Sequence, residues 1–349
     1  MGKIFLGGNN PVRVQSMAST PTEDIESTLK QIERLIKEDC EIIRLAIPSK
    51  RAVKAFKKIR KEVNVPLVAD IHFNYRLAIE AADSGADKIR INPGHIGDEK
   101  RVREVIRAAK ANGIPIRIGV NSGSLEIDLI DKYGGVTPEA LVESAMRWIT
   151  FFEKEGFHDI VVSVKSASVP QTITSYRILS KKTDYPLHVG VTESGPYSTG
   201  VIKSAIGIGT LLAEGIGDTL RVSLTADPLE EVKAAWEILK ALEIRTRGVM
   251  LISCPTCGRT RVDLLSIVKR VEEGIRNIKI PLKVAIMGCE VNGPGEAREA
   301  DVGIAATPGF GCIFRKGKII KKVPEEEIVK ALIEEIKSIE KEREKHEKI

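Results

Sequence analysis

The chain has 349 residues, of which 42% are hydrophobic and 29% charged, and its formal net charge is +6. This length exceeds one average domain, and because an α/β barrel alone uses about 250 residues, we expect one large domain and one smaller one. No apolar run approaches the roughly 20 residues of a membrane span, and the first residues lack the apolar segment of a signal peptide. We therefore expect a cytoplasmic protein without a membrane partner.

The excess positive charge raises the question of a nucleic-acid partner. Aromatic residues make up only 4% of the chain, and many lysines are interleaved with glutamates, as in EEIKSIEKEREKHEKI near the C-terminus. Such alternation is typical of solvated helix faces. We therefore predict no nucleic-acid partner.

Short β-branched segments recur along the first two thirds of the chain and predict strands. They lie at residues 11–17, 41–47, 66–72, 88–94, 115–121, 159–165, 186–192 and 218–224. Amphipathic segments such as IESTLKQIERLIKED lie between them, with apolar residues every three or four positions. Eight such alternations predict a closed (β/α)8 TIM barrel. The alternative, a doubly wound open sheet, would favour a Gly-rich dinucleotide loop after the first strand, and the sequence has none.

The pattern changes at EIRTRG, residues 243–248, where we place a domain boundary. We predict a substrate-binding barrel domain at 1–244 and a smaller α+β domain at 245–349. The smaller domain is expected to contain strands at 249–253, 283–288 and 301–306, a helix at 262–277 and a hairpin at 312–323. A final helix is predicted to begin at Pro324 and Glu325, a good N-terminal signature.

Three of the five cysteines lie close together in the sequence of the second domain. Cys254 and Cys257 follow an apolar strand in CPTCGRT, and Cys289 ends another in MGCEVNGPGEA, so the three would meet if these strands are neighbours. Spacing leaves three alternatives open. Zinc would require a fourth Cys or His, for which Cys312 is the nearest candidate; a [4Fe-4S] cluster tolerates three thiolates; and the pair could be metal-free. Clustered thiols fit a reducing compartment, and Cys40 is predicted to be a core residue.

Charged residues interrupt several apolar strands, which is unusual because an unpaired buried charge costs several kcal/mol. These cations are Arg44, Arg90, Arg117, Lys165 and Arg221. Internal carboxylates such as Asp70 and Glu193 balance only some of them. Because guanidinium groups offer paired donors that match phosphate oxygens, and Asn121 and Ser223 add neutral donors, we predict a phosphorylated ligand at the barrel mouth.

Four side chains are candidates for acid or base chemistry or for an additional ligand. Asp70 and His72 end the third strand and Glu193 ends the seventh, so all three are able to move protons at the mouth. His72 is either catalytic or a histidine that supports the site by hydrogen bonding. Glu296, after the turn in NGPGEA, either caps an open iron or is an ordinary charge at a helix start.

Long motifs along nearly the whole chain resemble those of the 4-hydroxy-3-methylbut-2-enyl diphosphate synthase family. They are DIHF at 70–73, KIRINPG at 88–94, RIGVNSGSL at 117–125, VVSVKSAS at 161–168, HVGVTESG at 188–195, IGDTLRVSLTADP at 216–228, SCPTCGR at 253–259 and GCEVNGPGEA at 288–297. The resemblance implies reductive opening of 2-C-methyl-D-erythritol 2,4-cyclodiphosphate with loss of water, in the methylerythritol phosphate route to isoprenoids. It also implies that two electrons enter through a [4Fe-4S] cluster.

The resemblance assigns roles to particular residues. The implied cluster ligands are Cys254, Cys257, Cys289 and, as an unusual fourth, Glu296. The implied diphosphate contacts are Arg44, Arg90, Arg117, Asn121, Lys165, Arg221 and Ser223. Asp70 and His72 correspond to polar groups lining the site, and Glu193 to the acid/base residue.

The same resemblance implies partners. Ferredoxin or flavodoxin would deliver the electrons. A homodimer would place the cluster domain of one chain over the barrel mouth of the other, where Asn292 would meet the substrate. The boundary at 243–248 leaves no room for the large domain that plant-type members insert, so the chain looks like the two-domain bacterial type. Cys312 has no counterpart in the family pattern.

Overall fold

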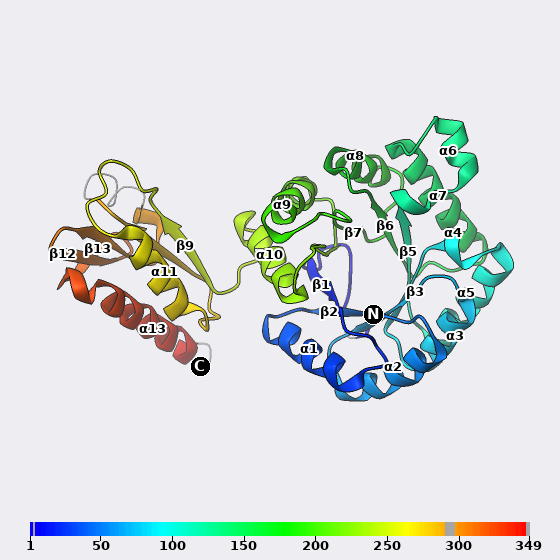
Figure 1. Cartoon of the computed structure of the whole chain (residues 1–349), viewed down its shortest axis with the longest axis horizontal. Helices are drawn as coiled ribbons and strands as arrows, with labels where there is room; N and C mark the ends of the chain where they lie inside the picture. The colour runs from blue at the N-terminus through cyan, green and yellow to red at the C-terminus, as the bar shows by residue number, and fades with distance from the viewer. Residues whose placement is uncertain (3, 290–296, 347–349) are drawn as a thin grey trace. The chain divides into compact units, whose positions relative to one another are not determined.

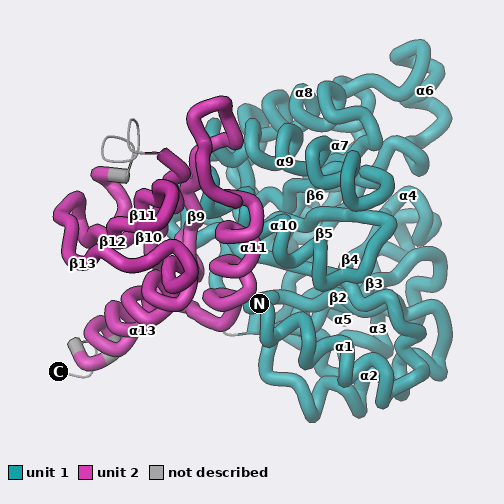
Figure 2. The backbone as a smooth tube through the Cα atoms, turned by 60° about the vertical axis from the view of Figure 1, so that its left-hand side comes forward, with its two compact units in different colours: residues 1–245 teal, residues 246–349 magenta. Residues whose placement is uncertain are grey.

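The computed structural model describes the chain except for residues 3, 290–296 and 347–349. Two compact units are present, Met1–Arg245 and Thr246–Ile349 (Figure 2). No helix in the described part of the chain is long and apolar enough to cross a membrane.

The first unit is a ring of parallel strands. They are β1 (Arg13–Met17), β2 (Ile42–Ala46), β3 (Leu67–Ile71), β4 (Lys88–Ile91), β5 (Ile116–Asn121), β6 (Ile160–Lys165), β7 (His188–Val189) and β8 (Thr219–Leu220). The sheet order is β6-β5-β4-β3-β2-β1-β8-β7, and a bridge between Val162 and Leu187 links the two ends. The predicted TIM barrel is confirmed.

Helices surround these strands (Figure 1). They are α1 (Ile25–Lys37), α2 (Lys50–Glu62), α3 (Tyr75–Asp83), α4 (Pro93–Ile96), α5 (Glu99–Asn112), α6 (Ile127–Tyr133), α7 (Pro138–Lys154), α8 (Val169–Leu179), α9 (Tyr197–Ala213) and α10 (Pro228–Ala241). Several begin at side-chain caps: Asp24 accepts from the Ser27 amide and Ser49 from the Ala52 amide. Such caps satisfy amides that the first turn leaves free.

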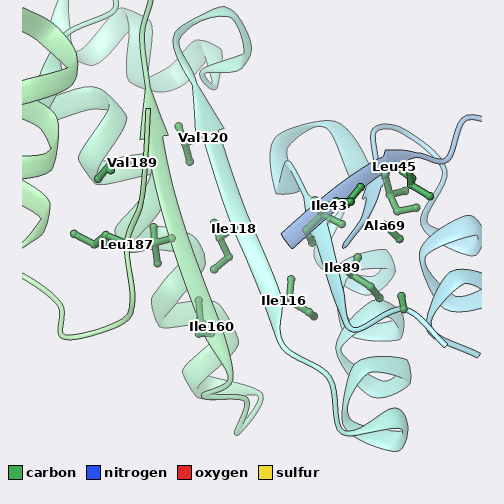
Figure 3. Packing of buried hydrophobic residues seen from close by; sticks show 14 of the residues in the cluster. Ile43, Leu45, Ala69, Ile89, Ile116, Ile118, Val120, Ile160, Leu187 and Val189 are labelled. Carbon is green, nitrogen blue, oxygen red and sulfur yellow. The ribbon is translucent and has the colours of Figure 1, made fainter. Parts of the chain in front are cut away.

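The barrel strands alternate between an apolar outer face and a polar inner face. Ile43, Leu45, Ile116 and Ile118 belong to the main hydrophobic core, which lies between sheet and helices (Figure 3). Because successive strand residues point to opposite faces, the residues between them face the barrel interior. This inner face carries most of the predicted site.

The two-residue strands β7 and β8 are much shorter than the seven-residue segments predicted from the sequence. Past the paired residues, the Arg221 amide donates to the Val189 carbonyl (3.1 Å), and the two segments meet again at an isolated bridge between Pro196 and Thr225. Gly190 then lies so close to the next strand that an added Cβ would be 2.5 Å from the Arg221 carbonyl oxygen. The chain turns away at Glu193, whose φ is +52°. β-branched composition predicted a strand here, but this close approach and turn end the pairing early.

Within its described residues, the second unit is a five-stranded sheet covered by two helices. Its strands are β9 (Val249–Ser253), β10 (Leu282–Met287), β11 (Val302–Thr307), β12 (Phe310–Arg315) and β13 (Lys318–Pro324), in the order β13-β12-β11-β10-β9. The first three are parallel and the last two form an antiparallel hairpin. The helices α11 (Leu264–Ile275) and α13 (Ile328–His346) pack on one face of the sheet in a shared core.

The final helix does not begin where the sequence predicted. Pro324 ends β13, paired with Phe310, and residues Glu325–Glu327 form a short 3-10 turn before α13 starts at Ile328. The Glu325 carboxylate accepts a hydrogen bond from the Gly309 amide (2.8 Å). Glu325 therefore stabilises the turn between β11 and β12 by this hydrogen bond and does not begin the final helix.

Candidate active site

Four of the predicted cations lie on the inner face of the barrel. Arg44, Arg90, Arg117 and Lys165 are 8%, 6%, 2% and 7% exposed. Arg90 pairs in register with both Asp70 and Arg117, and Lys165 with Asn121, so these residues share one face of adjoining strands. The structure thus brings together side chains that are far apart in the sequence.

Asp70 lies between two of these arginines and is almost fully buried. Its Oδ1 is 3.1 Å from Arg90 Nη1 and its Oδ2 is 3.4 Å from Arg44 Nε. Burial raises the pKa of Asp70, but Arg44 and Arg90 outweigh burial and hold the pKa well below its usual range. An ionised Asp70 at neutral pH suits orientation of the arginines; the catalytic role suggested for it stays a prediction.

We expect Asp70→Asn to destabilise the ligand-free protein by about 3–5 kcal/mol, because two buried guanidiniums lose their shared carboxylate. Since the pKa of Asp70 is lowered, its contribution is complete above the ordinary aspartate value of about 4 and is lost as the pH falls further. Urea unfolding of both proteins at several pH values tests this: the stability gap should be constant near neutrality and narrow only in acid. A variant as stable as wild type at pH 7 would contradict the pairing.

Arg117 and Lys165 have no carboxylate partner among the described residues. The Arg117 Nε and Nη1 atoms are buried, and no described residue forms a hydrogen bond with them. Burial, followed by the charges of Arg117 and Arg44, lowers the pKa of Lys165 well below its usual value. A bound anion would accept hydrogen bonds from Arg117 and would raise the pKa of Lys165. This unbalanced positive charge is the environment expected for the predicted phosphate ligand.

Two glycines provide the space in which these cations lie. An added Cβ at Gly119 would be 2.8 Å from Arg90 Nε, and one at Gly190 would be 2.5 Å from Lys165 Nζ. Any larger residue at either position would therefore displace Arg90 or Lys165.

Arg221 follows β8 and is held by a carboxylate that the sequence analysis missed. Glu231, in the first turn of α10 and only 3% exposed, accepts from Arg221 Nη2 at 3.2 Å and Nε at 3.3 Å. The same carboxylate accepts from the Leu224 amide (3.0 Å) and the Ser16 hydroxyl (3.2 Å). Glu231 thus fixes Arg221 and the segment that carries Ser223, which is half-buried.

We expect Glu231→Gln to lower kcat/KM by about tenfold or more, because Arg221 loses a charged hydrogen-bond partner that orients it. Steady-state kinetics with Glu230→Gln as the control test this, since Glu230 pairs with Lys233 on the helix surface. Glu231→Asp should restore part of the loss. Equal kinetics for both glutamine variants would contradict a positioning role for Glu231.

A cavity of about 190 Å³ lies between the loops that follow β4, β5 and β7. Its lining is His95, Asn121, Ser122, Gly123, Ser124, Thr192 and Glu193. Asn121 and Glu193 were predicted for the site, whereas Thr192 and the serines were missed because short polar loops after strands are common. Glu193 is exposed and adopts a left-handed backbone conformation, which is rare outside glycine and often occurs at functional sites.

His72 lies exposed on the loop after β3, outside the buried cationic group. Its ring is 6.2 Å from that of Phe73, which in turn stacks on His95 at 5.4 Å. Through this contact His72 adjoins the lining of the cavity. A catalytic role for His72 and a supporting role by hydrogen bonding both stay predictions.

The predicted cysteine site begins at the ends of two neighbouring strands. β9 and β10 are paired, with Ser253 opposite Ile286, and the Gly288 amide donates to Cys254 Sγ (3.2 Å). Cys257 is exposed and Cys289, next to Gly288, is half-buried. Among the residues that the structure describes, no three His, Cys, Asp or Glu side chains are gathered to hold a metal ion.

The remaining predicted residues of this site fall into two groups. Glu296 and Asn292 lie outside the described residues. Cys312 lies on β12 opposite Ala305, and Cys40 is buried in the barrel core as predicted.

The fold and site define a TIM-barrel protein whose interior is lined by buried cations, followed by a cysteine-bearing domain. The sequence matches the family described as the GcpE TIM-barrel domain over residues 1–236 and the GcpE protein C-terminal domain over residues 250–338. The chain therefore belongs to the GcpE family, and the predicted resemblance is confirmed.

Curated relatives are similar over nearly their whole length. A protein of Caldanaerobacter subterraneus subsp. tengcongensis is 57% identical over 98% of this chain and 96% of its own, and one of Clostridium tetani is 57% identical over 97% of each. Both are named 4-hydroxy-3-methylbut-2-en-1-yl diphosphate synthase (flavodoxin). A Yersinia pestis dihydropteroate synthase structure aligns with a TM-score of 0.47 at 14% identity, over 67% of this chain and 92% of that one, too weakly to inform the site.

Proposed function

We propose that the protein catalyses reductive ring opening and dehydration of 2-C-methyl-D-erythritol 2,4-cyclodiphosphate to (E)-4-hydroxy-3-methylbut-2-enyl diphosphate. The observation that carries this proposal is the barrel interior of a GcpE-family chain, where the five cations predicted from the sequence face two carboxylates. The cations are Arg44, Arg90, Arg117, Lys165 and Arg221, and the carboxylates are Asp70 and Glu231. The excess charge matches a diphosphate.

The proposed cofactor is a [4Fe-4S] cluster held by Cys254, Cys257, Cys289 and Glu296. Thiolates are the usual ligands of such clusters. The paired ends of β9 and β10, from which Cys254 and Cys289 emerge, support this ligand set. When bound, the cluster would supply the two electrons of the reduction. Zinc held by the same cysteines is the alternative that the test below distinguishes.

The barrel residues have defined tasks in this proposal. The guanidiniums of Arg44, Arg90 and Arg117 neutralise the diphosphate as it becomes the leaving group on ring opening, a form of electrostatic stabilisation. Lys165 adds a further charge from β6. Glu193, on the cavity rim, gives a proton to the substrate oxygen that leaves as water.

The proposed partners follow from the family. Flavodoxin, which the names of the relatives specify, is proposed as the electron donor in preference to ferredoxin. A homodimer is proposed in which the barrel and the cluster domain of different chains form one site, with Asn292 reaching the substrate. The proposed compartment is the cytoplasm, because clustered thiols are best kept reduced there.

Anaerobic reconstitution with iron and sulfide, followed by assay with the cyclic diphosphate and a strong artificial reductant, tests this function. We expect about four iron atoms per chain, matching sulfide, and formation of the linear diphosphate. Zinc without sulfide, together with no turnover of the cyclic diphosphate, would overturn the proposal.

A further inference from the structure

A buried lysine lies on the inner face of the barrel outside the set discussed so far. Lys88 is the first residue of β4 and is 0% exposed. It pairs in register with Val68 and precedes Arg90 by two residues, so both side chains point to the interior. Among the residues that the structure describes, its Nζ atom has no hydrogen-bond partner. An ammonium group in this position needs a compensating charge.

Two carboxylates close to Lys88 in sequence or on the adjoining strand are engaged elsewhere. Asp70, on the adjoining strand, is paired with Arg44 and Arg90. The carboxylate of Asp87, the preceding residue, pairs with Arg60 Nη1 (2.6 Å) and accepts a hydrogen bond from the Leu67 amide (2.8 Å). Neither carboxylate is therefore available to neutralise Lys88.

The other groups that act on Lys88 increase the positive potential around it. Burial, then the charges of Arg117 and Arg44, lower its pKa well below the usual value. His188 on β7 is fully buried, and its Nδ1 shares a 2.8 Å hydrogen bond with the Thr219 hydroxyl. Its Nε2 has no partner within the described part of the chain. The Met1 amino group is a further positive neighbour, since the charge of Lys88 lowers its pKa. The site is therefore rich in donors and lacks an anion.

We propose that Lys88 is a further determinant of phosphate binding, and that its charge becomes favourable when a ligand carrying multiple phosphate charges occupies the barrel. The inference rests on the proposed function and adds a fully buried cation of the barrel interior to the groups that act on the phosphate ligand. The charge of Lys88 has two opposite effects. It lowers the folding stability of the ligand-free protein because it is buried without a partner, and it increases the electrostatic attraction for an anion in the barrel. An apolar side chain of similar length would fill the same space without either effect.

Lys88→Met separates these two effects because they have opposite signs. We expect the ligand-free variant to melt a few degrees higher than wild type, since the uncompensated charge is removed. We expect its affinity for inorganic pyrophosphate to fall about tenfold, and its KM for the cyclic diphosphate to rise by a similar factor with little change in kcat. Calorimetric titration of the full-length protein with pyrophosphate measures the affinity.

Two further variants make the test specific. Lys54→Met removes an exposed lysine of α2, so it changes the net charge equally and should alter neither quantity. Lys88→Gln should weaken pyrophosphate binding as Lys88→Met does, which keeps the test valid if methionine does not fold. Wild type that binds pyrophosphate no better than Lys88→Met and Lys88→Gln would overturn the inference alone. Wild type that binds neither pyrophosphate nor the cyclic diphosphate would overturn the proposed function and the inference together.

Discussion

Cys257→Ser is expected to abolish reduction of the cyclic diphosphate and to prevent assembly of the iron-sulfur cluster. Cys257 is exposed on the loop after β9, so its thiol contributes little to packing. A serine hydroxyl is a far weaker ligand for iron than a thiolate. The variant should therefore fold normally, with the melting temperature of the unreconstituted wild type, and fail only in cofactor content and turnover.

Iron and sulfide content after anaerobic reconstitution measure this effect. Cys312→Ser is the matched control, because Cys312 lies on β12 of the same unit and has no counterpart in the family pattern. The control should retain the cluster and full activity. A Cys257→Ser protein with normal iron, sulfide and turnover would show that Cys257 is not a ligand. Loss of zinc alone would favour the structural zinc alternative.

The barrel could be predicted from sequence because its strands have a simple pattern. In KIRI and IRIGVN, isoleucines alternate with charged or small residues, and the structure places the isoleucines in the outer core and Arg90 and Arg117 inside. Period-two alternation determines the face of each residue once the strand is recognised. The ends of β7 and β8 were not predictable, since they depend on the contact between Gly190 and the backbone of the next strand.

Residues that support the site were harder to find than residues that form it. Glu231 lies in the first turn of α10, where glutamate is favoured by the helix dipole in any protein, so its contact with Arg221 has no signal in the sequence. Lys88 was hidden in the same way, as one charge at the start of a strand. The sequence predicts that Cys254 and Cys289 meet only if the strands that precede them are neighbours, and β9 and β10 are indeed paired. The role of Glu296 rests on the family resemblance.

Gly190→Ala is expected to impair catalysis strongly while the fold is retained. The added Cβ would lie 2.5 Å from Lys165 Nζ and 2.5 Å from the Arg221 carbonyl oxygen. The lysine side chain is able to move, but the carbonyl belongs to the backbone that carries Arg221, so the contact must shift one edge of the site. Displacement of catalytic groups by about 1 Å costs on the order of a hundredfold in rate, and we expect a loss of that size in kcat/KM.

Two other glycines give a graded comparison. At Gly119 the added Cβ would meet only Arg90 side-chain atoms, the nearest at 2.8 Å, so Gly119→Ala should cause a smaller loss. At Gly209, within α9, an added Cβ would lie more than 4 Å from every described residue other than its chain neighbours and the helix backbone. Gly209→Ala should therefore leave kinetics unchanged and stabilise the helix by about 0.5–1 kcal/mol. Kinetics and thermal melting of the three variants measure the order. None of these three glycines has a left-handed backbone, so the variants differ only in what the added Cβ contacts. Equal activity of all three variants would contradict a role for the positions of Lys165 and Arg221 in catalysis.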